Sequence, residues 1–399
     1  MRLAILGLCL VAPVAAADES AWRTSWDGAL YGYANSMRLH EDSVLNPGNQ
    51  VAGLAQRTDS AELRLNFKAE NETVRITARP IGLLRETRNA FGTQQRNEGY
   101  VSLWQVRVRA AEDWNVAAGR EVLNWGAAQF RSPSSPFYFD NGRTDPLREL
   151  VGMDALKLSW TPDMQNSVNL VRVVRSGYGA MQPDMWRNTW LAKFDRRSGD
   201  WAYGLVAVQV PHLPDFYGAH GQMTMSDELM LYGEFGSSAR PFALQSDADA
   251  AQPFTVQLPS SRRSTALAGA TYTFESGRAL SAEYLHDGHG YSAAQKDAYF
   301  QRASAMPGLA LGLMPRLLGR DYLHLVLQTN MTSDTGYWRL MYTRNLTDNG
   351  NELAAYGEAS LTPHLGIFGL AALPVGNARQ EFSALFTRSL TVGVKIALP

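Results

Sequence analysis

Basic side chains recur at short, even spacings in the early part of the chain. The members of this group are two or four residues apart within each segment: Arg64 and Lys68, Arg75 and Arg79, Arg107 and Arg109. Such spacings place side chains on one face of an extended strand, and neighbouring strands lie about 4.8 Å apart. The sequence therefore predicts a basic wall, which would attract anions if low-dielectric walls enclosed it.

Later segments carry charged residues that are expected on the same water-facing surface. Acids facing the basic wall would direct the field across an enclosed, water-filled interior. The predicted lining set is Arg64, Lys68, Arg75, Arg79, Arg107, Arg109, Glu283, Arg339 and Glu358. An ordinary polar lining with an incidental charge imbalance is the alternative, and the sequence leaves both interpretations open.

The segment from Leu123 to Gly152 combines charge with stiffness. It contains Pro133, Pro136 and Pro146, each of which fixes a backbone angle. Its charged members are Arg131, Asp140, Arg143, Asp145 and Arg148. A stiff charged loop can narrow a channel, so this segment is the predicted constriction; an outward surface loop is the alternative.

Residue patterns for catalysis or metal binding are weak. His286-Asp287-Gly288-His289 resembles a metal pair only loosely, and a turn at a loop entrance explains it better. Asp140-Asn141-Gly142 and residues 246–249 lack the ligand spacing of a calcium loop. We therefore expect no catalytic residue, no metal and no cofactor. The formal net charge of −1 gives no indication of a nucleic-acid partner.

The elements that would position these residues are strands. From Ala61 to Ala69 the odd positions are apolar and the even positions are polar, and the alternation resumes from Val74 to Arg79. Only a strand puts successive side chains on opposite faces, so one face is apolar and the other wet. The intervening turn at residues 70–72 predicts an antiparallel hairpin.

Similar segments recur to the end of the chain, separated alternately by short turns and long connections. The long connections are expected at Leu39–Asp59, Leu83–Gly99, Leu123–Gly152, Ser246–Arg263 and Gly288–Arg320. Short turns at one end and long loops at the other are typical of a transmembrane β-barrel. The preferred strand number is 18, closing with Glu381–Leu398; 16 is possible if Met230–Leu244 holds one strand fewer. Residues Ala293–Leu318 are predicted to form a helical extracellular loop or a plug.

The amino terminus predicts export. Arg2 precedes an apolar core, and Ala15-Ala16-Ala17 offers a cleavage site, so residues 1–17 form a predicted signal peptide and 18–399 a single barrel domain. The only cysteine, Cys9, would be removed with the signal. The expected location is the outer membrane of a Gram-negative cell. The expected partners are its lipids, lipopolysaccharide and the barrel-assembly machinery.

Composition is compatible with a membrane protein built from strands. After the signal, no stretch reaches the roughly 18 apolar residues of a membrane helix. The mean hydropathy is −0.24 although 45% of residues are hydrophobic. Several tryptophans, including Trp114, Trp160 and Trp190, lie near predicted strand ends, where aromatic belts form in barrels.

One stretch resembles a known group of proteins. Gly119-Arg120-Glu121-Val122-Leu123-Asn124-Trp125-Gly126, followed by Asp145-Pro146-Leu147-Arg148, resembles porin-like outer-membrane barrels and, more distantly, the alginate-export type. The resemblance implies a monomeric barrel through which a solute or secreted product crosses the outer membrane. For the alginate-export type it also implies an arginine-rich lumen and an inner-membrane export system as a partner. The chain departs from such barrels in ending Ile396-Ala397-Leu398-Pro399 rather than in an aromatic residue.

These observations together predict a porin-like channel for a solute, possibly an anion, rather than an enzyme. Two other classes stay open at this point. An outer-membrane hydrolase would need a catalytic cluster at the membrane rim, for which His286 and His289 are the only candidates. A structural or receptor barrel would have a blocked lumen.

Overall fold

The computed structural model describes residues 21–179, 184–211, 213–239, 243–245, 255–257, 261–312, 314–330 and 336–398. The predicted signal peptide and residues 246–249 lie outside these ranges. No helix within them is long and apolar enough to cross a membrane.

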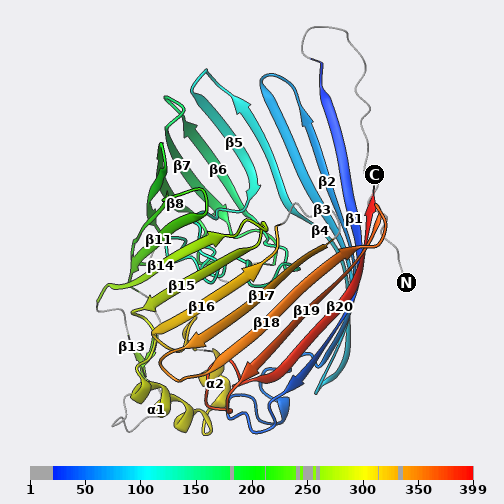
Figure 1. The fold of residues 1–399 in the computed structure, drawn as a ribbon, viewed down its shortest axis with the longest axis vertical. Helices are drawn as coiled ribbons and strands as arrows, with labels where there is room; N and C mark the ends of the chain where they lie inside the picture. Colours follow the sequence, from blue (N-terminus) through cyan, green and yellow to red (C-terminus); the bar gives the residue numbers. More distant parts are fainter. Residues whose placement is uncertain are drawn as a thin grey trace.

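Eighteen antiparallel strands form one sheet that closes on itself (Figure 1). The first nine are β1 (Arg23–Leu39), β2 (Arg57–Glu70), β3 (Val74–Asn89), β4 (Gly92–Arg109), β5 (Trp114–Glu121), β6 (Met153–Trp160), β7 (Asn166–Arg175), β8 (Thr189–Ser198) and β9 (Trp201–Gln209). The other nine are β10 (Phe216–Thr224), β11 (Leu229–Ser238), β14 (Arg263–Thr273), β15 (Ala279–Asp287), β16 (Asp321–Gln328), β17 (Gly336–Asn345), β18 (Asn351–Ser360), β19 (Leu365–Val375) and β20 (Phe386–Leu398).

Closure is made by the first and last strands. β1 pairs on one side with β2, with Arg23 opposite Glu70, and on the other with β20, with Gly28 opposite Leu398. The preferred prediction of 18 strands is therefore confirmed, and 16 is wrong. Residues 229–238 form the single strand β11, and the short β12 (Ala243–Gln245) and β13 (Thr255–Gln257) pair only with each other.

The two faces of the wall differ as the alternation predicts. Along β15, Leu280 and Tyr284 are exposed on the outside, whereas Ser281, Glu283 and Leu285 are buried on the inside. Outward side chains on β1 and β16–β20 are likewise apolar, for example Leu390, Val392 and Val394 on the closing strand. An apolar outer band and a polar inner face follow from one period-2 pattern.

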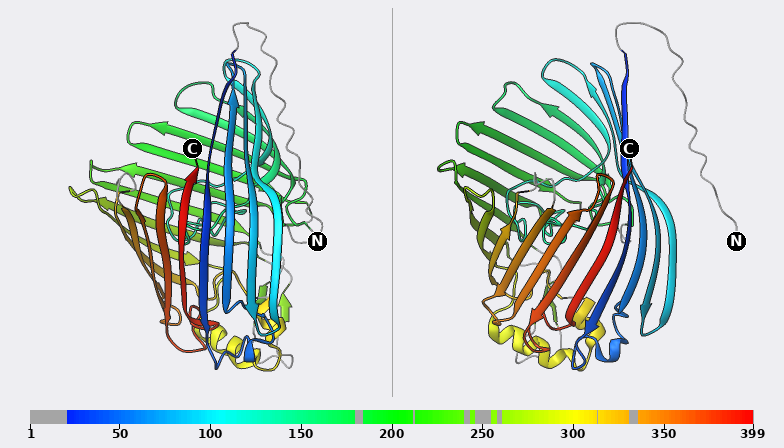
Figure 2. Two further views of the ribbon diagram at one scale, coloured as in Figure 1. Left: turned by 90° about the vertical axis from the view of Figure 1, so that its right-hand side faces the viewer. Right: turned by 45° about the vertical axis from the view of Figure 1, so that its right-hand side comes forward.

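Short turns lie at one end of the barrel and most long loops at the other (Figure 1). One predicted connection is wrong: Leu83–Gly99 is mostly strand, because β3 and β4 continue to a two-residue turn at residues 90–91. From Arg85 to Glu98 this hairpin carries mostly polar residues on both faces, including Gln95, Arg96 and Asn97. Without an apolar face it shows no alternation, so the strand pattern was lost. β1–β4 are consequently longer than the other strands (Figure 2).

The connection between β15 and β16 contains two helices at the long-loop end (Figures 1 and 2). They are α1 (Ala293–Ala303) and α2 (Pro307–Gly312), and a capping box at Ser292 and Gln295 starts α1. Tyr299 and Phe300 pack with Leu45 from the β1–β2 connection, which holds the short helix η1 (Pro47–Asn49). Both helices lie beyond the strand ends rather than between the walls of the barrel, as expected of a loop helix rather than a plug (Figure 2).

Candidate functional site

The connection from Leu123 to Gly152 lies inside the barrel (Figure 1). Two acids of the inner wall bind its backbone. Glu234 on β11 accepts hydrogen bonds from the Ala128 amide at 3.0 Å and from the Ser132 hydroxyl at 2.6 Å. It also accepts from the Ser134 amide and hydroxyl, at 3.3 and 2.7 Å. Four donors from the loop therefore converge on one buried carboxylate.

Gly126 permits this close approach. Its φ of +88° is left-handed, and a Cβ there would lie 2.1 Å from Glu234 Oε1. Any side chain would be strained twice, by backbone conformation and by overlap with the carboxylate. The glycine at this position therefore fits the loop to the wall.

Glu283 and Arg339, predicted to face water, are instead covered by the loop. Glu283 on β15 accepts from the amides of Gln129 and Phe130, at 2.5 and 2.9 Å, and from the Tyr232 hydroxyl at 2.7 Å. Arg339 on β17 donates to the Gln129 side-chain oxygen at 3.1 Å. Both side chains do project inward, but they are only 2% and 6% exposed. The alternation pattern predicted water beside these two side chains. A loop more than a hundred residues away in sequence fills that space instead.

The charged residues predicted for the constriction divide into two groups. Arg143 donates to the carbonyl oxygens of residues 126–128 and so fixes the loop internally. Asp140 lies between Arg148 at 2.7 Å and Arg131 at 3.7 Å. Of the five, Asp145 and Arg148 line the open space beside the loop.

That open space is a cavity of about 460 Å³ between the loop and the inner faces of β1–β4, β19 and β20. The loop contributes Asp145, Leu147, Arg148, Glu149 and Val151; the walls contribute Tyr33, Asn35, Thr58, Glu62, Arg64, Leu83, Arg85, Arg96, Glu98, Tyr100, Leu370 and Thr391, and Tyr178 follows β7. Its charges comprise four acids and four arginines, so this part of the lumen is electrically balanced.

Most of the balance comes from close ion pairs. Arg64 lies 2.6 Å from Glu62 and 3.6 Å from Glu149, and Arg79 lies 2.9 Å from Glu149. Arg64 also donates to the Leu147 carbonyl at 3.0 Å. These contacts hold the end of the loop against β2 and β3 while neutralising two members of the predicted basic wall.

The rest of the basic group lies nearer the short-turn end. Glu70 accepts from both Lys68 and Arg75, at 2.7 and 2.8 Å. Arg107 and Arg109 line a small cavity beside the β2–β3 turn, and no ion pair joins either to another described residue. The continuous basic wall is therefore wrong in part, because Glu62, Glu70 and Glu149 interrupt it and leave an excess of cations only at this end.

A second lumen cavity, of about 420 Å³, was missed by the sequence analysis. Lys193 forms an ion pair with Asp195 and lies 5.6 Å from the Trp125 ring centroid. His220 shares this cavity and lies 3.5 Å from Asp195. Four strands, β7 to β10, and the loop meet here, and no spacing along the chain indicates that.

Within the described residues, the surroundings of His286 do not form a catalytic cluster. His286 lies 2.8 Å from Asp321, which also accepts from the Tyr284 hydroxyl at 2.6 Å, on the outside of the wall. Among the described residues no hydroxyl nucleophile is hydrogen-bonded to His286, and no three acidic, cysteine or histidine side chains could share a metal ion.

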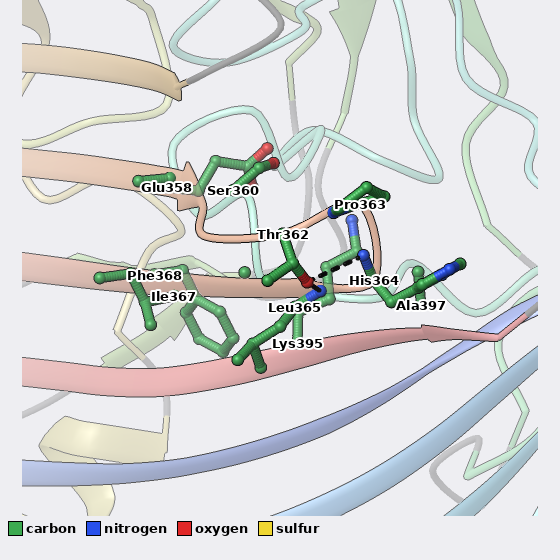
Figure 3. Close-up of a pocket in the computed structure, with 12 residues that line it drawn as sticks. Glu358, Ser360, Thr362, Pro363, His364, Leu365, Ile367, Phe368, Lys395 and Ala397 are labelled. Atoms are coloured by element: carbon green, nitrogen blue, oxygen red, sulfur yellow. Dashed lines mark hydrogen bonds between the residues drawn. The ribbon is translucent and has the colours of Figure 1, made fainter.

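Glu358, the last predicted lining residue, lies at the short-turn end. It accepts from the Tyr356 hydroxyl at 2.6 Å and borders a cavity of about 110 Å³ with Lys395 and the β18–β19 turn (Figure 3). Thr362 Oγ1 closes that turn by accepting from the amides of His364 and Leu365. This cavity is therefore bounded by the turn itself.

Solved structures share this barrel. OccK11 (OpdR) of Pseudomonas aeruginosa superimposes with a TM-score of 0.56 at 11% identity, covering 94% of this chain and 96% of that one. OccAB1 of Acinetobacter baumannii gives 0.56 at 10% identity with the same coverage, and OprD of Pseudomonas aeruginosa gives 0.52 at 10%, covering 94% and 95%. These likenesses establish the fold. No protein-family model matches the chain, and no curated protein matches it in sequence. The expected similarity to the alginate-export type gains no support and stays a prediction.

Proposed function

We propose that the protein is an outer-membrane, porin-like channel through which small solutes pass beside the Leu123–Gly152 loop. The observation that carries this proposal is a closed barrel with an apolar outer band whose lumen keeps a cavity of about 460 Å³ lined by charged and polar side chains. In a bilayer such a wall satisfies every backbone hydrogen bond internally. The porin barrels that share the fold support the same function.

The predicted signal peptide over residues 1–17 would deliver the chain to this membrane. The assembly machinery and lipopolysaccharide would then be its partners. An alternative role, as the exit duct for a product supplied by an inner-membrane export system, rests only on the alginate-export resemblance. Among the described residues, His286 has no hydroxyl nucleophile hydrogen-bonded to it, so the catalytic alternative gains no support there.

The proposed selectivity is a modest preference for anions. Paired charges in the cavity largely cancel, whereas Arg107 and Arg109 at the short-turn end have no acidic partner among the described residues. Uncompensated cations enclosed by low-dielectric walls concentrate anions locally. The preference should therefore come from this end of the lumen rather than from the constriction.

Planar-bilayer recording tests both parts. Stable conductance steps are expected, and across a salt gradient the reversal potential should show anion preference. Arg107→Glu combined with Arg109→Glu should shift the reversal potential towards cations. Arg278→Glu is the matched control, because Arg278 lies at the same end but over the ring of Trp338, 5.9 Å from its centroid, on the outside. An absence of steps would favour a plugged barrel, and cation preference in the unmodified protein would contradict the anion proposal.

A further inference from the structure

A groove opens on the outer wall of the barrel, away from the lumen. Its volume is about 520 Å³, and it runs over β4–β7 to the segment before β8. Its floor is apolar, with Trp104, Leu156 and Val174 all more than a third exposed. Small residues deepen it: Ala118, Gly119 and Ala155 line it between the larger side chains.

Charged residues form one end of this groove. Asp154 accepts two hydrogen bonds from Arg120, at 2.7 and 3.0 Å, and two from Arg175, at 2.9 and 2.8 Å. Arg120 also donates to the Val101 carbonyl, so it is fully used, whereas the Arg175 side chain is 61% exposed. One carboxylate between two guanidinium groups leaves a net positive charge.

Further cations surround this pair. Arg187 lines the groove, and no ion pair joins it to another described residue. Asp184 is nearby, but its carboxylate already accepts from the Ser176 amide and hydroxyl and from the Trp186 amide. Arg172 lies exposed next to the groove, 5.3 Å from the Trp190 ring centroid. Among the residues that the structure describes here, the groove therefore offers guanidinium donors and no carboxylate that is free of hydrogen bonds.

The height of the charged end is fixed by the strand register. Trp114 faces Trp160 at the short-turn end of β5 and β6. Towards the long-loop end, Leu156 of β6 pairs with Arg172 of β7. Arg172 in turn pairs with Trp190, the second residue of β8. The charged cluster thus lies one step beyond the apolar band, where an arginine on the lipid-facing wall costs little. If the long loops lie outside the cell, as the proposed location requires, that level would be the headgroup layer of the outer leaflet.

We infer that this groove binds one phosphorylated glycolipid of the outer leaflet, with phosphate on Arg175 and Arg187 and an acyl chain along Trp104, Leu156 and Val174. This inference rests on the proposed location in the outer membrane. Charge complementarity selects the ligand, because planar guanidinium groups bind phosphate through paired hydrogen bonds. The apolar floor excludes a free phosphate as the preferred occupant.

Native mass spectrometry of the detergent-solubilised protein tests the site, with lipid A carrying two phosphates as the probe. We expect one retained lipid A per barrel and little retention of dephosphorylated lipid A. Arg175→Gln combined with Arg187→Gln should lower retention by about tenfold or more, since each arginine near an anionic surface contributes about 1 kcal/mol. Arg187→Gln alone should give an intermediate loss, because that side chain has no ion pair to break within the described structure.

The control is Arg388→Gln, which removes an exposed arginine from the long-loop end of β20, outside the groove. It should retain lipid A like the unmodified protein. Equal retention of both lipid A forms, or full retention by the double variant, would overturn the inference. Conductance steps recorded from the same samples separate the two proposals: steps without lipid retention contradict only the lipid site, and retention without steps contradicts only the channel.

Discussion

Glu234 and Glu283 show how much of the lumen is decided by single side chains. Both lie on the inner face of neighbouring parts of the wall, and each gathers loop amides that would otherwise be buried without an acceptor. An unsatisfied buried donor costs about 1–3 kcal/mol. Several donors on one carboxylate are therefore enough to decide whether the loop stays folded inward.

Replacing Glu234 with alanine should release the first half of the loop. The Ala128 and Ser134 amides and two serine hydroxyls would lose their acceptor. We expect larger mean conductance and more open-channel noise in planar bilayers. Glu358→Ala is the control, since Glu358 is an inward acid that accepts a hydrogen bond from the Tyr356 hydroxyl and none from the loop among the described residues. Indistinguishable traces from the two variants would show that Glu234 does not hold the loop.

For single residues, the sequence predicted which face of the wall a side chain occupies better than it predicted which residues that side chain contacts. Period-2 alternation correctly placed Arg64, Glu283 and Arg339 on the inner face. It could not predict that Glu283 and Arg339 lie under the loop, because their partner Gln129 is 154 and 210 residues away. The acids that neutralise the basic wall were visible as Glu62 and Glu70, but pairing depends on side-chain geometry that spacing does not give.

Connections between strands determine the shape of the long-loop end. The β15–β16 connection, with its two helices, packs against the β1–β2 and β19–β20 connections through Leu45, Tyr299, Phe300 and Ala384. Beside this cluster Glu381 accepts from the Tyr322 hydroxyl, the Leu318 amide at 2.9 Å and the Asn345 side chain at 2.8 Å. One carboxyl group thus joins the β19–β20 connection to the β15–β16 connection and to strands β16 and β17.

That carboxyl group makes the packing of the loops depend on pH. Burial raises the pKa of Glu381 from 4.5 to about 7, outweighing its hydrogen bonds, and Asp348 adds to the effect. A raised pKa means that the packed state binds the proton more tightly than the unpacked state. Its stabilising contribution is complete below about pH 4.5 and is lost as the pH rises through about 7.

Hydrogen exchange measures this effect. Protection factors of the residues around Leu318, corrected for the intrinsic rate, should fall between pH 5.5 and pH 8.5. In Glu381→Gln, which cannot ionise, they should be nearly constant over the same range. Protection that rises with pH in the unmodified protein would contradict the expected direction.

The sequence predicted the positions of strands well where one face is apolar and poorly where both faces are polar. The segments at Ala61–Ala69 and Val74–Arg79 lie inside β2 and β3. The outer half of the β3–β4 hairpin was assigned to a loop because Gln95, Arg96 and Asn97 give it no hydrophobic period. Backbone pairing with β3 maintains it as strand all the same.

The whole molecule is a closed wall with an obstructed interior. Closure of β1 on β20 leaves no sheet edge in the membrane band, as a spanning sheet requires. Fold class and strand number could be predicted from the sequence, because alternation and turn lengths repeat along the whole chain. The course of the Leu123–Gly152 loop and the two lumen cavities could not, since they are set by contacts across the barrel.

Thiol modification of a cavity-lining position tests the central claim most directly. Leu370 faces the cavity from β19, whereas its neighbour Ala371 shares the outward face of the strand with Ile367 and Leu373. Cys9, within the predicted signal peptide, is the only native cysteine, so a single introduced thiol is the only target in the mature protein. In planar bilayers a charged methanethiosulfonate reagent should lower the single-channel current of Leu370→Cys and leave that of Ala371→Cys unchanged. Undiminished current through modified Leu370→Cys would show that ions do not pass beside the loop.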